Sequence, residues 1–176
     1  FNRFIKNYSN LKKVSKAPSN QILKLWEGLG YYRRAKALHK TIKIIVRKNK
    51  SKLPNRFEDL KKLPGIGDYT ANVLLALVYN QQSFGVDGNV KRLFSRILNK
   101  PENKIDFDKL IYLNKKKIFF SRRNSDLAES LMEFGSQICK PKIPECKICP
   151  IKKYCNSSHN RPGIKKRKNK SFFEKK

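Results

Sequence analysis

LPGIGDYTA, residues 63–71, joins two predicted helices, a short one that a capping box at Asn55 and Glu58 would open and a nearly all-apolar one over residues 69–79. Gly65 and Gly67 flank Ile66, and glycine adopts backbone angles that other residues avoid. A tight turn here directs backbone N–H groups outward at the start of the second helix, where a phosphate can bind without any contact to a base. An ordinary helix–helix turn is the alternative, because a pair of glycines at this spacing is common.

Helical periodicity continues outward from this turn in both directions. Phe1, Phe4, Ile5 and Tyr8 form one apolar stripe, and residues 90–98 carry another. No segment has a convincing strand pattern, so the predicted fold class is all-α. Further helices are expected at about residues 20–29, 32–47, 69–79, 107–119 and 126–138.

The charge of the chain limits what its partner can be. Forty-two Lys and Arg residues against 13 Asp and Glu residues give a formal net charge of +29. Nucleic acid is the first candidate for a polyanion attracted by this excess, and a lysine-rich solvated surface is the alternative. No run approaches the ~18 apolar residues of a membrane span, and no signal-peptide pattern is found.

The four cysteines of the chain lie together in CKPKIPECKICPIKKYC, residues 139–155. Cys139, Cys146, Cys149 and Cys155 are separated by six, two and five residues. The segment is too polar to bury them in a core of its own. They can pair as disulfides, bind zinc or hold an iron–sulfur cluster, and the array alone leaves these alternatives open.

Four motifs follow one another along the chain: LWEGLGYYRRAKALHK (25–40), LPGIGDYTA (63–71), VDGNVKRLFSR (86–96) and the cysteine array. Together they resemble the helix–hairpin–helix DNA glycosylases that carry an iron–sulfur cluster, and among these the A/G-specific adenine DNA glycosylases. The resemblance covers about residues 1–160. It implies a helical barrel lobe (N-terminally incomplete) over residues 1–99 with the helix–hairpin–helix at about 56–79, an iron–sulfur cluster lobe over 100–160, and a basic tail or linker over 161–176.

The same resemblance implies a cofactor and several DNA contacts. A [4Fe–4S] cluster, mainly structural and redox-responsive, would be held by Cys139, Cys146, Cys149 and Cys155, with zinc as the chemical alternative. Disulfides are not expected in a cytoplasmic protein. Residues that would contact DNA are Gly65, Ile66, Gly67, Tyr69 and Thr70 in the hairpin and Lys140 and Lys142 beside the cysteines.

Cleavage of an N-glycosidic bond gives the sugar oxocarbenium character, which a nearby carboxylate stabilises. Asp87 directly precedes a predicted helix, and taken alone it is typical of an N-cap. The resemblance of VDGNV to the family's catalytic segment implies instead that Asp87 is the catalytic aspartate and that Asn89 supports the site or caps the helix. Tyr69 stands where bifunctional members carry a Schiff-base lysine, near the catalytic groups, and so favours a monofunctional enzyme that uses water.

A base must leave the stack before it can be cleaved. Tyr31, in GLGYY, matches a tyrosine that the family wedges beside the lesion, and a core aromatic at a helix start is the alternative. Glu129 matches a polar residue that contacts adenine. Asp126 and Glu129 also form a capping-box pattern, which is the alternative for Glu129.

The resemblance therefore implies a monofunctional hydrolase of base-excision repair that removes adenine opposite 8-oxoguanine or guanine in double-stranded DNA. We expect a cytoplasmic, nucleoid-associated monomer. The family's general-acid glutamate and its 8-oxoguanine-recognition domain have no counterpart here, so the polypeptide as given is expected to be inactive or nearly so. The alternatives are an endonuclease III-like glycosylase and lyase, or a non-catalytic iron–sulfur DNA-binding module.

Overall fold

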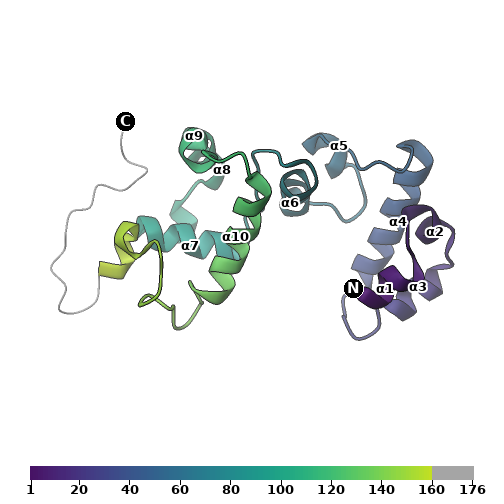
Figure 1. The fold of residues 1–176 in the computed structure, drawn as a ribbon, viewed down its shortest axis with the longest axis horizontal. Helices are drawn as coiled ribbons and strands as arrows, with labels where there is room; N and C mark the ends of the chain where they lie inside the picture. Colours follow the sequence, from purple (N-terminus) through teal and green to yellow (C-terminus); the bar gives the residue numbers. More distant parts are fainter. Residues whose placement is uncertain (160–176) are drawn as a thin grey trace. The chain divides into compact units, whose positions relative to one another are not determined.

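The computed structural model describes residues 1–159, and this range contains α-helices, short 3-10 helices and no strand (Figure 1). The prediction of an all-α fold is confirmed for this range. The expected basic tail, 161–176, lies outside the described residues. The chain forms two compact units that divide between Ala71 and Asn72. The lobe boundaries expected from the sequence, 1–99 and 100–160, stay a prediction.

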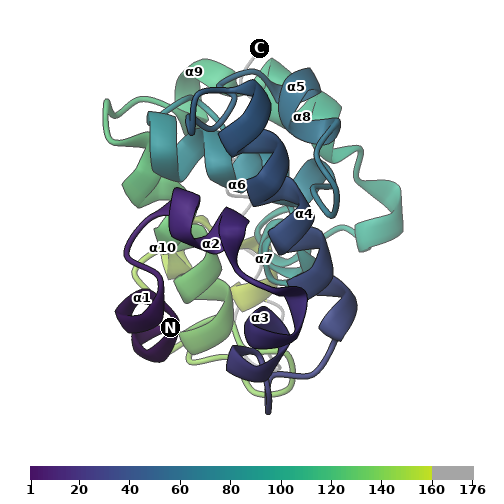
Figure 2. The same ribbon diagram turned by 90° about the vertical axis from the view of Figure 1, so that its right-hand side faces the viewer.

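The first unit, Phe1–Ala71, is organised around one long helix, α4, against which α2 and α3 pack (Figures 1 and 2). Val14, Ala17, Ile22 and Ile42 form one buried hydrophobic cluster of this unit. This unit contains α1 (Asn2–Asn7), α2 (Leu11–Lys16), α3 (Ser19–Leu25), α4 (Tyr32–Lys48), α5 (Phe57–Lys61) and the start of α6 (Asp68–Tyr79).

The second unit begins at Asn72 and has an aromatic core of its own. Phe84 and Phe94 stack with ring centroids 6.4 Å apart, and Phe119 packs against Phe84 at 5.7 Å. Helix α10 crosses α7 in this unit. The elements are the rest of α6, α7 (Gly88–Leu98), η1 (Glu102–Lys104), α8 (Phe107–Leu113), α9 (Lys115–Ile118), α10 (Asn124–Gln137), η2 (Lys152–Tyr154) and η3 (Asn156–His159).

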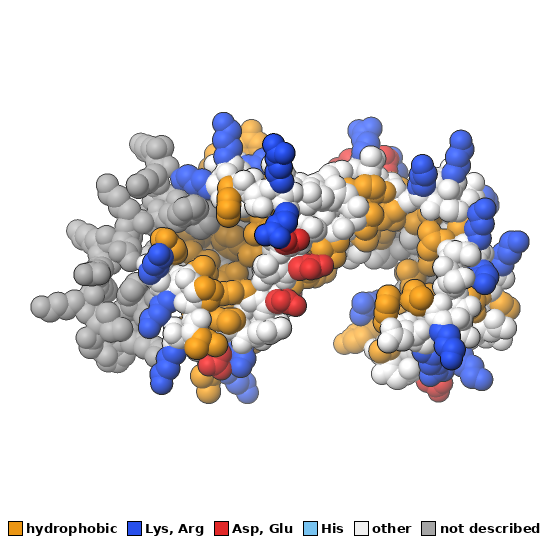
Figure 3. Space-filling model, in the orientation of Figure 1, with side chains coloured by type: hydrophobic (Ala, Val, Ile, Leu, Met, Phe, Trp, Pro, Cys, Tyr) orange, Lys and Arg blue, Asp and Glu red, His pale blue; other side chains and the backbone are white. Residues whose placement is uncertain are grey.

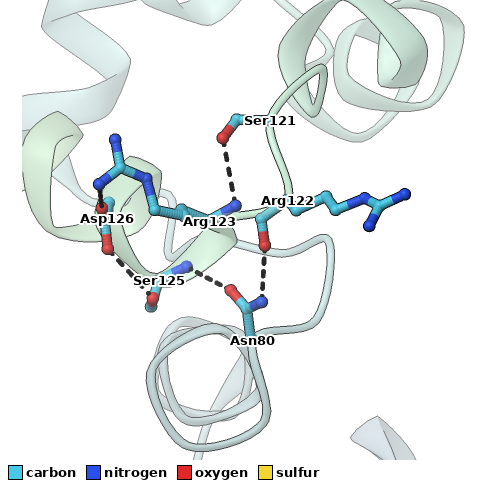
Figure 4. A network of polar contacts seen from close by, with 6 residues as sticks. All are labelled: Asn80, Ser121, Arg122, Arg123, Ser125 and Asp126. Atoms are coloured by element: carbon cyan, nitrogen blue, oxygen red, sulfur yellow. Dashed lines mark hydrogen bonds and ion pairs between the residues drawn. The ribbon is translucent and has the colours of Figure 1, made fainter.

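The end of α6 is fastened to the start of α10 through Asn80 (Figure 4). The Asn80 side chain donates to the Arg122 carbonyl at 2.7 Å and accepts the Ser125 N–H at 3.1 Å. The Asn80 carbonyl in turn accepts the Asn124 side-chain amide at 2.7 Å. Three hydrogen bonds thus fix the point at which α10 begins.

Within the described residues, no helix is both long enough and apolar enough to cross a bilayer.

Candidate functional site

The LPGIGDYTA turn packs directly on α4. Gly65 has φ +77°, and a Cβ placed on it would lie 2.6 Å from Ala37 Cβ, so glycine is needed both for its backbone angle and for the space. The Thr41 hydroxyl donates to the Pro64 carbonyl at 2.8 Å and holds the same turn. The predicted helix–turn–helix arrangement, α5 followed by α6, is therefore formed.

The outer side of this turn is accessible. Gly67, which precedes α6, is exposed; in the first turn of α6, Asp68 and Tyr69 are exposed and Thr70 is half-buried. Asp68 forms an ion pair with Lys61 across the turn. The helix dipole and the N–H groups at this end of α6 favour an anion, and the Lys61–Asp68 pair adds no net charge there.

Tyr31 is held in an unusual position before α4. Its φ of 49° is left-handed, and the side chain is 80% exposed. The Trp26 indole N–H donates to the Gly30 carbonyl at 3.0 Å and so fixes the loop that presents it. A strained and exposed aromatic residue is a poor core residue, so the core alternative for Tyr31 is wrong.

Asp87 is the N-cap of α7 and a half-buried carboxylate at the same time. One carboxylate oxygen accepts the Val90 N–H at 2.8 Å, and the other accepts the Asn89 side-chain amide at 2.9 Å. The capping interpretation from sequence is thus confirmed. Because Asn89 also donates to the carboxylate, the orientation of Asp87 is fixed from both sides.

A continuous series of hydrogen bonds leads from Asp87 to the first cysteine. The Asn89 side-chain oxygen accepts from the Arg92 guanidinium at 2.8 Å. Arg92 also donates to the Cys139 carbonyl at 2.9 Å and to the Gly135 carbonyl at 2.6 Å. Helix α7 therefore carries a carboxylate at its start and, one turn later, a cation that holds the end of α10.

The four cysteines surround a single cavity of about 170 Å³, and none of them is in a disulfide. Its other lining side chains are mostly apolar, among them Leu93, Phe134 and Ile151. Burial, followed by the neighbouring thiols, raises the pKa of Cys149. Such crowding of thiols is unfavourable for four free thiolates and becomes favourable once a cation is shared among them.

The loop that follows Cys139 is held by a second arginine of α7. Arg96 donates to the Lys140 carbonyl at 2.7 Å, to the Pro141 carbonyl at 2.8 Å and to the Cys139 sulfur at 3.4 Å. Arg96 was not predicted as a site residue. Its spacing of four residues from Arg92, on the face of α7 that carries Leu93, is the signal that could have indicated it.

Four cysteine thiols are a donor set that suits either zinc or an iron–sulfur cluster. The four cysteines line one cavity, so the residue types and their placement are compatible with either group. Among the described residues, no three His, Cys, Asp or Glu side chains are grouped closely enough to hold a metal ion.

The remaining predicted residues lie in the second unit. Lys140 forms an ion pair with Glu145 at 3.0 Å, whereas Lys142 is exposed without an ion-pair partner among the described residues. Glu129 is exposed on α10, beside which acidic side chains gather in Figure 3. Since α10 begins at Asn124, Asp126 lies inside the helix and pairs with Arg123, so the capping-box alternative for Glu129 is wrong.

The predicted site residues therefore form two sets, one in each compact unit. The hairpin, Tyr69 and Tyr31 lie in the first unit, and Asp87, Asn89, Glu129 and the cysteines lie in the second. Within the second unit, Arg92 joins Asp87 to the cysteine loop. The expected DNA and catalytic roles of these residues stay predictions.

The described residues combine an all-helical fold, a glycine hairpin, an aspartate that caps α7 and a cavity lined by four cysteines. Together these features define a class of proteins. The family model described as HhH-GPD superfamily base excision DNA repair protein matches residues 1–114. The chain belongs to this superfamily.

Curated relatives point the same way. The adenine DNA glycosylase of Buchnera aphidicola subsp. Baizongia pistaciae is 37% identical over 158 residues, which are 90% of this chain and 45% of that protein. The adenine DNA glycosylase of Homo sapiens is 27% identical over 157 residues, or 88% of this chain and 29% of that protein. The chain thus spans about half the length of the bacterial relative, or less for the human one.

Solved structures confirm the predicted helix–hairpin–helix glycosylase fold. A thermostable thymine-DNA glycosylase superposes with a TM-score of 0.75 at 23% identity, covering 89% of this chain and 73% of that one. A non-covalent endonuclease III–DNA complex superposes with a TM-score of 0.71 at 22% identity and the same coverage. At these identities the likeness concerns the fold.

Proposed function

We propose that this chain is the core of an adenine DNA glycosylase, which hydrolyses the N-glycosidic bond of adenine opposite 8-oxoguanine or guanine in duplex DNA. The observation that carries the proposal is the Asp87 carboxylate, fixed by Val90 and Asn89 at the start of α7. The named relatives at 27–37% identity support the choice of base. Tyr69 in place of a lysine supports hydrolysis rather than lyase chemistry.

In this mechanism Asp87 stabilises the positive charge that develops on the sugar as the base departs. Both carboxylate oxygens already accept hydrogen bonds, which limits the motion of the group. A water molecule then attacks the sugar, and the products are free adenine and an abasic site. Glu129 would contact the adenine.

DNA binding is proposed for the two surfaces that the sequence indicated. The start of α6 offers N–H groups to a phosphate, with Gly65 and Gly67 giving the backbone close access. Tyr31, exposed and held in a left-handed conformation, is suited to fill the space that an extruded base leaves. Lys142 would meet the backbone beside the cysteine loop.

The cysteine cavity is proposed to hold a [4Fe–4S] cluster on Cys139, Cys146, Cys149 and Cys155. The four cysteines that line one cavity and the membership of the chain in the base-excision superfamily support this proposal. When bound, the cluster would cross-link residues 139–155 and respond to redox state. Through Arg92, the loop is in turn connected to Asp87. We also propose that the protein is monomeric and cytoplasmic, associated with the nucleoid.

The test uses protein expressed from its complete reading frame and duplexes that contain adenine opposite 8-oxoguanine, adenine opposite guanine, or an oxidised pyrimidine. Under single-turnover conditions we expect release of free adenine from the first two and no release from the third. Borohydride trapping on abasic DNA should give no covalent adduct, because no lysine stands at position 69. A trapped adduct would favour the glycosylase and lyase, and binding without release would favour the non-catalytic module.

A further inference from the structure

Helix α4 carries a stripe of five cations that the proposed site does not use. Successive positions along a helix turn by about 100°, so these five fall within ~80° of one another around the axis. The helix contains no Asp or Glu at all. We call these residues the α4 stripe: Arg33, Lys36, Lys40, Lys43 and Arg47.

The stripe is exposed and lacks charge compensation. All five side chains are exposed, and none forms an ion pair with an acidic side chain in the described part of the chain. Like charges three and four residues apart on a helix repel one another and lower its stability. Figure 3 shows Lys and Arg side chains projecting from the part of the surface drawn as α1–α4 in Figure 1. A polyanion bound along the stripe would relieve this repulsion.

A surface hollow marks one end of the stripe and connects it to the hairpin. The hollow has a volume of about 490 Å³ and is lined by Lys40, Lys43 and Arg47 together with Pro64 of the LPGIGDYTA turn. The same turn is held on α4 by Thr41, which donates to the Pro64 carbonyl at 2.8 Å. The proposed phosphate site of the hairpin and the α4 stripe are therefore neighbouring surfaces of one compact unit.

We propose that the α4 stripe is a second DNA-backbone site, which binds duplex phosphates beyond those that the hairpin contacts. From Arg33 to Arg47 the stripe extends about 21 Å along the helix, the length of roughly six base pairs of B-form DNA. Five cations at this spacing match a row of phosphates in sign and in length. The inference rests on the proposed function in one respect, because the hairpin must itself bind duplex DNA.

The experiment replaces three stripe cations together, Lys40→Gln, Lys43→Gln and Arg47→Gln, in protein expressed from its complete reading frame. Binding to an undamaged 30-base-pair duplex is measured between about 50 and 200 mM salt. Each lost phosphate contact lowers the slope of log K against log salt by about 0.9. We therefore expect the slope to fall by about 2 to 3 and the affinity at the lowest salt to fall at least ~10-fold.

A matched variant removes the same charge from the second unit, through Lys109→Gln, Lys115→Gln and Lys116→Gln, all exposed positions. Its slope should change by less than about 1. An equal fall in both variants would overturn the proposal, because it would show attraction to net charge alone. A loss seen with single-stranded DNA but not with duplex would overturn the assignment to duplex.

The outcome also separates this inference from the proposed function. If the unaltered protein binds the duplex with a steep salt dependence and the stripe variant does the same, the stripe inference fails and the hairpin proposal stands. If the unaltered protein does not bind the duplex, both fail. Thermal unfolding of the stripe variant should be unchanged or slightly improved, which shows that a loss of binding does not come from a loss of fold.

Discussion

At the scale of single residues, Asp87 illustrates how a structural role and a chemical role can share one side chain. As an N-cap it needs only one oxygen, which accepts the Val90 N–H. The second oxygen is held by Asn89, whose own side-chain oxygen is held by Arg92. An ordinary cap does not require this additional support, so the geometry gives the carboxylate one fixed direction.

We expect Arg92 to support both Asn89, which holds Asp87, and the carbonyl of Cys139. We expect Arg92→Met to lower the free energy of unfolding by about 2 kcal/mol, because the carbonyls of Cys139 and Gly135 lose their donor. It should also reduce the iron retained after purification. Lys91→Met, at an exposed neighbouring position, is the control and should change neither quantity. Equal iron content in the two variants would contradict the role assigned to Arg92.

His39 gives the first unit a defined pH dependence. The ring is 3% exposed, its Nδ1 contacts the Ser19 hydroxyl at 3.1 Å, and its Nε2 has no hydrogen-bond partner among the described residues. Burial first, and the charge of Lys43 second, lower the pKa of His39 below its usual 6.5. The unfolded chain therefore binds the proton more readily than the folded one.

The sign of this effect follows from linkage. The stability that the neutral ring contributes is fully present above pH 6.5 and is lost as the pH falls below that value toward the lowered pKa. We expect the unaltered protein to lose more unfolding free energy between pH 7.5 and pH 5 than a His39→Leu variant does. Denaturant titrations at the two pH values measure it, and identical losses would show that His39 does not titrate in this way.

Some site residues could be recognised from the sequence around them, and others could not. The four cysteines could be selected from the sequence by their spacing, whereas Asp87, which alone is typical of an N-cap, could be selected only through the resemblance of VDGNV. Gly135 could not be selected, because its importance arises from a neighbour on another helix: a Cβ there would lie 2.6 Å from Asn89 Cβ. Contacts between α10 and α7 join residues that are far apart in the sequence, so no periodic pattern within either helix indicates them.

At the scale of elements, most helices form where apolar spacing predicted them, and the departures have local causes. The helix expected over 107–119 is divided into α8 and α9 at Asn114. The Asn114 side chain donates to the Leu110 carbonyl at 2.9 Å and competes with the backbone for that acceptor. Helix α6, expected to be central, is buried at Leu75 and Ala76 but exposed at Val78.

The hairpin offers a matched pair of glycine substitutions. Gly65→Ala should lower the unfolding free energy by about 2 kcal/mol or more, because φ is +77° and the added Cβ would meet Ala37. Gly67→Ala should change it by less than about 1 kcal/mol, since φ is not positive there and nothing lies within 4 Å. Chemical denaturation of both variants provides the comparison, and equal effects would contradict the account of the turn.

At the scale of the whole molecule, each compact unit has a buried hydrophobic cluster of its own. The cluster in the first unit is aliphatic, around Ile22 and Ile42, and the one in the second is aromatic, around Phe84 and Phe94. The division between the units falls inside α6, a mostly apolar helix, at Asn72. Periodicity marks where a helix runs but does not show which of the two units each of its turns joins.

The class of the protein could be predicted from the sequence more readily than the contacts between its helices. Net charge and four ordered motifs indicated a basic helical DNA-repair protein, and the family match over residues 1–114 agrees. The route from Asp87 through Arg92 to Cys139 depends on two helices crossing, which no single segment encodes. These hydrogen bonds connect the cysteine region to the proposed catalytic carboxylate.

The most direct test of this account is adenine release by Asp87→Asn. In protein from the complete reading frame, single-turnover release from a duplex with adenine opposite 8-oxoguanine should fall at least ~10²-fold, because the developing sugar cation loses its charge partner. Binding of the same duplex should change by less than about twofold, since the amide still caps α7. An unchanged rate of adenine release would contradict the central claim.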